Sequence, residues 1–471
     1  MAVLGAIAVP HPPLIMPEVG NGREKIIEKT IESYRKAMAF VSSLKPDTVI
    51  ITSPHAKGWR DCFSISSGSH AYGDFSDFRA PQLEIGCDYD EELAQSIADE
   101  LKKDEIRAIL YPYGEEALDH ATMIPLRFLS EFMTEVKVVR ISLSGFSPLA
   151  HYTLGEAVAK CAEKLGRRIV MIASGDLSHK LKEDGPYGYS ADGPMFDRDI
   201  CEIFKSGDFL KLLNLNQAVC ESAAECGYRS FLIMAGALDS LGVKPELLSY
   251  EGPFGVGYAV ATFRVEGSDP KRNFAAQYEK IQQDLADKRH ESEDIVVSLA
   301  RRTIESVVKS GILTRAATTD DLRAYLPQIP QELTKKKASC FVTIHKYGNL
   351  RGCIGTLMPV CSSLGEEIER NAISACSSDP RFDPVTDSEL PYLEYSVDVL
   401  DEPESIKSPE ELNPRVYGVI VTKGARRGVL LPDLDGVDTV EQQLSIAKRK
   451  AGLDPYEEGC SLKRFTVKRH F

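Results

Sequence analysis

The chain has 471 residues, which is enough for two or three domains and at least one large hydrophobic core. Its 70 acidic residues outnumber its 56 basic ones, and the net charge of −14 argues against general binding to nucleic acid or to anionic membranes. The eleven cysteines form neither a CxxC pair nor the CxxxCxxC motif of a radical iron–sulfur enzyme. With no secretory leader and no apolar run near the roughly 18 residues of a membrane helix, we expect a cytoplasmic protein with reduced thiols.

The first 265 residues alternate between strand-like and helix-like stretches. Compact apolar strands separated by helices are typical of an α/β fold, in which a central sheet is flanked by helices. We therefore predict one α/β domain over residues 1–265. Its expected elements are a strand at Val3–Val9, a helix at Gly22–Ser43, and strands at Thr48–Thr52, Lys137–Leu143, Arg168–Ala173 and Tyr258–Val265.

The composition changes after Val265. Residues 266–294 are rich in charged side chains and poor in large apolar ones, which is typical of a linker or a linker helix. Residues 295–471 are expected to form a smaller α+β domain. Its predicted elements are helices at Ile295–Lys309 and Cys361–Ser377, a hairpin with arms Ala338–Lys346 and Leu350–Leu357 joined at Tyr347-Gly348-Asn349, and strands at Leu393–Leu400 and Tyr417–Thr422.

Common catalytic motifs are missing from the sequence. It contains no GxxxxGK[ST] phosphate loop, no HExxH and no GxSxG. Gly252, Gly255 and Gly257 precede a strand, whereas a dinucleotide-binding motif lies between a strand and a helix. These observations argue against a kinase, a common nicotinamide dehydrogenase or a serine hydrolase.

Histidines mark the ends of three predicted strands. His11 follows the first strand, His55 follows the second, and His179 follows the strand that ends at Ala173. His120 lies at a junction between a loop and a helix. Because ligands bind at the carboxyl ends of strands in α/β sheets, we predict that these four histidines share one site. Any one of them alone is better interpreted as a turn or interface residue, and we keep that interpretation for His70 and His151.

Two imidazoles and one anionic ligand, with open positions, are what a catalytic ferrous iron needs. Unligated histidines nearby can then move protons. Glu225 and Cys226 open a predicted helix, where the helix N-terminus favours an anionic ligand, and Glu251 is a rival. The alternative is that Glu225 is a helix-start charge and Cys226 a buried packing thiol.

The histidine motifs resemble those of the LigB-like class III extradiol ring-cleavage dioxygenases and of their Memo relatives. The likeness covers residues 1–265 and rests on four segments. They are His11 near the N-terminus, Ser53-Pro54-His55, Asp119-His120 and Ser174-Gly175-Asp176-Leu177-Ser178-His179. The resemblance implies metal binding by His11 and His55, acid/base catalysis by His179 with His120, and an accompanying carboxylate at Asp176.

The same resemblance leaves the third ligand open. The dioxygenases place a glutamate near the start of a late helix, and Memo relatives place a cysteine there. This sequence offers both, as Glu225 and Cys226. A carboxylate suits a reactive ferrous site better, whereas a thiolate is more easily oxidised. We favour Cys226, because the domain that follows points away from a catabolic role.

The second half resembles protein A of the AmmeMemoRadiSam system, and the whole chain resembles a fusion of proteins B and A of that system. The motif Leu350-Arg351-Gly352-Cys353-Ile354-Gly355 carries the likeness, and Asp379-Pro380-Arg381-Phe382 and Gly428-Val429-Leu430-Leu431-Pro432 support it. The resemblance implies a radical SAM partner on another chain. Alternation along the second hairpin arm puts Arg351 and Cys353 on one face, which suggests an anion-binding or thiol site. We slightly prefer the alternative of a structural hairpin whose glycines permit close packing.

Two functions fit these residues. The first is extradiol cleavage of a catechol-like or aminophenol-like ring at Fe(II) or another divalent metal. The second is a metal-holding protein that serves a radical SAM enzyme in a modification or biosynthetic system and cleaves no ring. The sequence leaves open the substrate, the native metal and the oligomeric state, a homo-oligomer included.

Overall fold

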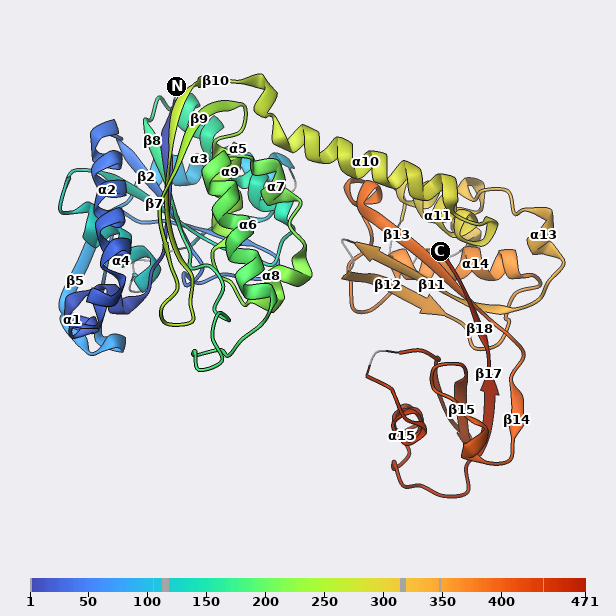
Figure 1. Ribbon diagram of the computed structural model, residues 1–471. Coiled ribbons are helices and arrows are strands. Elements are labelled where there is room, and N and C mark those ends of the chain that lie inside the picture. The colour runs from blue at the N-terminus through green and yellow to red at the C-terminus, as the bar shows by residue number, and fades with distance from the viewer. Residues whose placement is uncertain (1, 105, 112–117, 314–318, 347–348, 435) are drawn as a thin grey trace. The chain divides into compact units, whose positions relative to one another are not determined.

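The computed structural model describes residues 2–104, 106–111, 118–313, 319–346, 349–434 and 436–471 (Figure 1). The chain forms two compact units, Met1–Glu279 and Lys280–Phe471, which we call unit 1 and unit 2. Tyr347 and Gly348, where the sequence predicts a hairpin turn, lie outside the described residues.

Unit 1 is built on an eight-stranded sheet with the order β6-β3-β7-β2-β8-β1-β10-β9. The four strands β7, β2, β8 and β1 are mutually parallel, and β10 and β9 add to them in antiparallel fashion. A separate hairpin pairs β4 with β5. The strands are β1 (Val3–Val9), β2 (Thr48–Ser53), β3 (Phe63–Ser66), β4 (His70–Phe75), β5 (Ala80–Asp88), β6 (Ala108–Tyr111), β7 (Lys137–Ser142), β8 (Ile169–Ser174), β9 (Leu241–Glu251) and β10 (Tyr258–Ser268).

Helices cover both faces of this sheet, as Figure 1 shows. Along β1, Ala6 and Ala8 belong to the core beneath α3, α5 and α9, whereas Ile7 and Val9 belong to the core beneath α2 and α4. Burial on both faces explains why the central strands are continuous apolar runs. The helices are α1 (Pro17–Gly20), α2 (Glu28–Leu44), α3 (Glu91–Leu101), α4 (His120–Leu129), α5 (Pro148–Lys164), α6 (Asp192–Ser206), α7 (Phe209–Leu213), α8 (Gln217–Ala223) and α9 (Tyr228–Ala237).

The predicted α/β fold is confirmed, with several local differences. The helix expected from Gly22 begins as a short 3-10 helix at Arg23–Ile27 and becomes α-helical only at Glu28. Strands β3, β4, β5, β6 and β9 were also not predicted from the sequence. Of these, β9 contains Pro245, which lacks the N–H that a central strand needs. The sheet tolerates Pro245 because β9 is an edge strand.

Unit 2 contains two four-stranded sheets, with the orders β12-β11-β13-β18 and β14-β17-β15-β16. Helices α11 and α14 pack against the first sheet, and α15 packs against the second. The strands are β11 (Ser339–Lys346), β12 (Asn349–Gly355), β13 (Leu393–Leu400), β14 (Glu404–Ile406), β15 (Gly418–Lys423), β16 (Arg426–Leu430), β17 (Ser461–Phe465) and β18 (Val467–His470). The helices are α11 (Ile295–Lys309), α12 (Thr319–Leu322), α13 (Gln331–Thr334), α14 (Leu364–Ser377) and α15 (Val440–Lys450).

The segment expected to be a linker or linker helix contains α10 (Phe274–Ser292). The boundary between the two compact units falls inside this helix, between Glu279 and Lys280. Among the helices of the described residues, none combines the length and the apolar character needed to cross a membrane.

Close packing of α5 on α9 yields a first prediction. A Cβ atom on Gly155 would lie 2.0 Å from the carbonyl oxygen of Ile233, a contact that only movement of the backbone can relieve. Gly155→Ala should therefore lower the free energy of unfolding of unit 1 by about 1–3 kcal/mol, the usual cost of overpacking. Urea unfolding can be followed through Trp59, the single tryptophan of the chain, which lies in unit 1.

Gly242→Ala is the matched control, because the nearest atom to its added Cβ lies at an ordinary 3.6 Å. This control should change the unfolding free energy by no more than about 0.5 kcal/mol. Equal stability of the two variants would contradict the proposed close packing of α5 and α9.

Candidate metal centre

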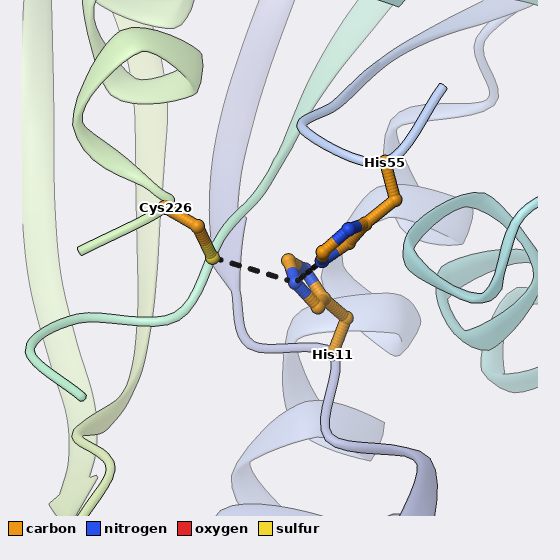
Figure 2. A group of neighbouring side chains, drawn as sticks. All are labelled: His11, His55 and Cys226. Atoms are coloured by element: carbon orange, nitrogen blue, oxygen red, sulfur yellow. Dashed lines mark hydrogen bonds between the residues drawn. The ribbon is translucent and has the colours of Figure 1, made fainter. Parts of the chain in front are cut away.

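Three of the side chains singled out in the sequence meet at the carboxyl edge of the sheet in unit 1 (Figure 2). Ligand atoms of His11, His55 and Cys226 all lie within 4.8 Å of one another. Nε2 of His11 is 3.2 Å from Nε2 of His55 and 3.5 Å from Sγ of Cys226. His11 follows β1, His55 follows β2 and Cys226 precedes α9, so three separate segments supply the group.

Two hydrogen-bond contacts on the side away from Nε2 fix the orientation of the His11 ring. Its Nδ1 lies 3.0 Å from the Ser174 hydroxyl, and its backbone N–H donates a 2.8 Å hydrogen bond to the Asp176 carboxylate. These contacts direct Nε2 toward His55 and Cys226, as partners of a metal ligand typically do. Burial, together with the neighbouring His55, His120 and His179, holds the pKa of His11 well below its usual value. His11 is therefore neutral, which is the form that binds a metal.

Glu225 and Cys226 have different partners. The Glu225 carboxylate accepts a 2.6 Å hydrogen bond from the backbone N–H of Tyr228 and so serves the start of its own helix α9. The Cys226 thiol instead lies against His11. The third rival, Glu251, accepts hydrogen bonds from the N–H and the hydroxyl of Thr30. Of the three alternatives, only Cys226 joins the two histidines.

A close approach between two loops positions Cys226. The loop after β8 passes so near the start of α9 that a Cβ on Gly175 would lie 2.2 Å from the Cα of Gly227. The Asp176 carbonyl accepts hydrogen bonds from the N–H groups of Cys226 and Gly227, and the Asp176 N–H donates to Sγ of Cys226. Because Gly175 has no side chain, the two loops can make this contact, which orients the Cys226 thiol toward His11.

The other two histidines of the predicted site lie in the same cluster. The His120 ring is 4.4 Å from that of His55 and 5.5 Å from that of His11, measured between centroids. His179 is close enough to lower the pKa of His11. The predicted shared site thus includes all four histidines. His70, which instead pairs with Asp88, and His151, which is buried beside Phe63, lie outside the cluster.

Aromatic rings flank the cluster on two sides, and sequence reasoning missed both. Phe78 packs edge-on against His120 with ring centroids 5.1 Å apart, and Tyr187 packs in the same way against His179 at 5.2 Å. Tyr187 is 62% exposed, which is unusual for a large aromatic residue. This exposure beside a histidine marks Tyr187 as a candidate site residue, and it can be seen only in the structure. The two rings add apolar surface beside His120 and His179.

A buried ion pair supports His55 and His120. Asp119 caps α4 by accepting from the Thr122 N–H, and it also accepts a 2.6 Å hydrogen bond from Ser53, two residues before His55. Arg140 is 1% exposed and lies 3.4 Å from the same carboxylate. The sequence could have indicated this ion pair, because Arg140 lies inside the apolar run of β7 and a buried arginine requires an anionic partner.

The donor set fits a divalent transition metal. Burial lowers the pKa of His55 as well as that of His11, so both imidazoles are available as neutral ligands. Burial and the nearby Asp176 raise the pKa of the Cys226 thiol, and a bound cation would take the place of its proton. Asp176 itself is buried, which raises its pKa to about 7 and places a proton-exchanging carboxyl beside the ligands.

Comparison with known proteins shows two family matches along the chain. Residues 5–261 match the family described as the catalytic LigB subunit of aromatic ring-opening dioxygenase. The chain belongs to the LigB family. Residues 297–470 match the AMMECR1 family, so a LigB domain is followed by an AMMECR1 domain, and the predicted fusion is confirmed.

Similar proteins share one or both domains. Protein CA_C1420 of Clostridium acetobutylicum is 39% identical over 478 residues, which cover 100% of this chain and 99% of that protein. A Thermotoga maritima protein is 47% identical over 175 residues, which cover 37% of this chain and 95% of that protein. The crystal structure of uncharacterized protein PH0010 from Pyrococcus horikoshii has 32% identity and a TM-score of 0.33, and the match covers 38% of this chain and 91% of that one.

The residues singled out in the AMMECR1 domain are Arg351 and Cys353, and each has its own partner. The Arg351 guanidinium forms two hydrogen bonds, of 2.9 and 3.0 Å, with the Glu389 carboxylate. Sγ of Cys353 lies 3.2 Å from the hydroxyl of Thr343 on the neighbouring strand. In the pairing of β11 with β12, Gly352 lies opposite Ile344 and Leu350 lies opposite His345, so a register shift falls at Arg351 and interrupts the simple alternation.

Removal of either histidine of the group should abolish stoichiometric metal binding. We expect His11→Ala and His55→Ala to lose bound metal in anaerobic metal analysis of the purified chain, because each removes one of three donors. Glu225→Gln is a control one residue from Cys226, and His70→Asn is a control histidine outside the cluster. Metal retained at the wild-type level in both alanine variants would contradict metal binding by His11 and His55.

The contact between the two loops can be tested without touching a ligand. Gly175→Ala adds a Cβ where the Gly227 backbone already lies, so the start of α9 must move and carry Cys226 away from His11. We expect a loss of metal affinity of at least about tenfold, as for other residues that orient ligands. Gly242→Ala should keep wild-type affinity, and an equal affinity of the two variants would contradict the positioning role of this contact.

Proposed function

We propose that unit 1 is a metal-dependent enzyme of the extradiol ring-cleavage type, which acts at Fe(II) on a catechol-like or aminophenol-like substrate. One observation carries the proposal. Four histidines converge on a single edge of the sheet, and of these His11 and His55 form a group with Cys226 that could hold a metal ion. A purely structural metal site has no use for two further histidines beside it, whereas acid/base catalysis does.

His179 and His120 are in the neutral form, which has a ring nitrogen free to take a proton. Burial lowers the pKa of both, and that of His120 falls to about 4 with the help of His55, so both are neutral near pH 7. His179 would take a proton from a substrate hydroxyl and later return it to the opened ring, with His120 assisting. Fe(II), when bound, would supply adjacent open positions for the two heteroatoms of the substrate and for dioxygen.

Apolar surfaces favour a planar ring as the substrate. Phe78 and Tyr187 border the cluster next to the two unligated histidines. Aromatic side chains prefer stacked or edge-on contact with a second ring, which each such pair stabilises by about 0.5–1.5 kcal/mol. The family to which the chain belongs is named for aromatic ring-opening dioxygenases, which agrees with this class of substrate.

A second candidate is a metal-holding protein that works with a radical SAM partner and cleaves no ring. Two observations favour it. The Cys226 thiol lies with the two histidines, whereas the Glu225 carboxylate binds the start of α9, and a thiolate in an oxygen-consuming site is prone to oxidation. The same chain also carries an AMMECR1 domain, which a catabolic dioxygenase does not need.

Oxygen uptake separates the two candidates. The full chain is loaded anaerobically with Fe(II) and then mixed with air-saturated buffer and a panel of catechols and aminophenols. Uptake that matches the substrate consumed supports ring cleavage. Stoichiometric iron without uptake on any compound supports the metal-holding role and contradicts the leading proposal.

The role of His179 gives a sharper prediction. His179→Asn should retain the metal but lose about 10²–10⁴-fold in turnover, because an acid/base group changes the rate without binding the cation. Metal content and initial rates of oxygen uptake measure the two effects separately. His70→Asn is the control, since His70 lies on the β4–β5 hairpin and pairs with Asp88. Loss of metal from His179→Asn would make His179 a ligand and overturn its assigned role.

A further inference from the structure

Cys353 in unit 2 is not a packing residue. On β12 the neighbouring Gly352 faces α14, where an added Cβ would lie 2.3 Å from the carbonyl oxygen of Ala375. Because side chains alternate along a strand, Cys353 faces the opposite side of the sheet, away from the core of α11 and α14. There its half-buried thiol lies beside the Thr343 hydroxyl. Close packing therefore accounts for Gly352 but leaves Cys353 unexplained.

The second motif of this domain contacts the backbone of the same cysteine. Asp379 is 2% exposed and accepts a 2.9 Å hydrogen bond from the Cys353 N–H. Its two oxygens also hold Nε and Nη2 of Arg381, at 2.9 and 2.7 Å. Nη2 of Arg381 lies 3.3 Å from the carbonyl oxygen of Cys353. The two motifs that identify the domain thus meet at one place, with a guanidinium fixed next to the cysteine.

A second guanidinium approaches from β18. Arg469 is held by the Asp398 carboxylate through Nε and Nη2, at 2.7 and 3.1 Å. In the sheet, Cys353 pairs with Thr343, and Thr343 pairs with Ser396 on β13. Asp398, two residues further along β13, pairs with Arg469, so Arg469 and Cys353 lie on the same face of the sheet. Within the described part of the chain, neither arginine uses Nη1 in a hydrogen bond to protein, so each retains donors for a ligand.

We propose that Cys353 is the nucleophile of a second site, which takes a small electrophile carrying a carboxylate that Arg381 and Arg469 bind. Reactive thiols are typically half-exposed and lie next to cationic side chains, and guanidinium groups match carboxylates geometrically. In the reaction, the thiolate sulfur forms a bond to the electrophilic carbon. The leaving group departs with its bonding electron pair, and the thiol proton passes to solvent. The site uses neither the metal nor any residue of unit 1.

Two alkylating reagents that differ in charge test the proposal. Iodoacetate and iodoacetamide both transfer a carbon to sulfur and release iodide, but only iodoacetate carries a carboxylate. Rate constants at each cysteine of the full chain are measured by peptide mass spectrometry. The ratio of the two rates at one thiol cancels its exposure and its degree of ionisation. We expect this ratio at Cys353 to exceed that at the half-buried Cys460 by about tenfold, the effect of one charge-assisted contact.

Variants of the first arginine complete the test. Arg381 is 52% exposed, so Arg381→Gln should fold, and it should bring the ratio at Cys353 most of the way to that at Cys460. Arg381→Lys keeps the positive charge but loses the planar guanidinium that can bind a carboxylate through two hydrogen bonds. We therefore expect an intermediate ratio of the two alkylation rates at Cys353. Acetate should lower the ratio at Cys353 in the wild type, and acetamide should not. A ratio at Cys353 no higher than at Cys460, a ratio unchanged in Arg381→Gln, or a Cys353 that reacts with neither reagent would each overturn the proposal.

Discussion

The parallel pairing of β8 with both β1 and β2 is the constraint on which the metal centre depends. The register places Val9 opposite Ser174 and Thr52 opposite Ala173, so the three strands end at one level of the sheet. His11, Asp176 and His55 follow those ends by two or three residues each and therefore emerge side by side. A shift of one residue in either pairing would turn a ligand away from the site.

Much of this arrangement could be predicted from the sequence, because each histidine is identified by its position relative to the strand just before it. A histidine after an apolar strand can be recognised without knowing how the strands pair, and parallel pairing then brings such histidines together. The choice between Glu225 and Cys226 was different. Adjacent residues at a helix start point roughly 100° apart, and which one faces the histidines depends on the contact between Gly175 and Gly227, two residues 52 positions apart in the sequence. No pattern within one segment reveals such a contact.

Unit 2 shows the same limit of local patterns. The glycines of its first motif could be predicted to permit close packing, and Gly352 does so against α14. The sequence predicted Arg351 and Cys353 on one face of a strand, but Arg351 forms hydrogen bonds with Glu389, and Arg381 contacts the backbone of Cys353. The chain thus carries a candidate metal centre rich in histidines in one unit and a proposed thiol site beside arginines in the other. The two sites draw on different chemistry and can be tested independently.

X-ray absorption at the metal edge tests the central claim that His11, His55 and Cys226 bind one metal ion. Zn²⁺ is a suitable probe for the full chain because it has no redox chemistry of its own. The account predicts one sulfur neighbour at about 2.3 Å and two imidazole nitrogens at about 2.0–2.1 Å, with the remaining position taken by a light atom. A stoichiometrically bound ion surrounded only by nitrogen and oxygen would contradict the account. A carboxylate, that of Glu225 or Glu251, would then be the better candidate for the third ligand.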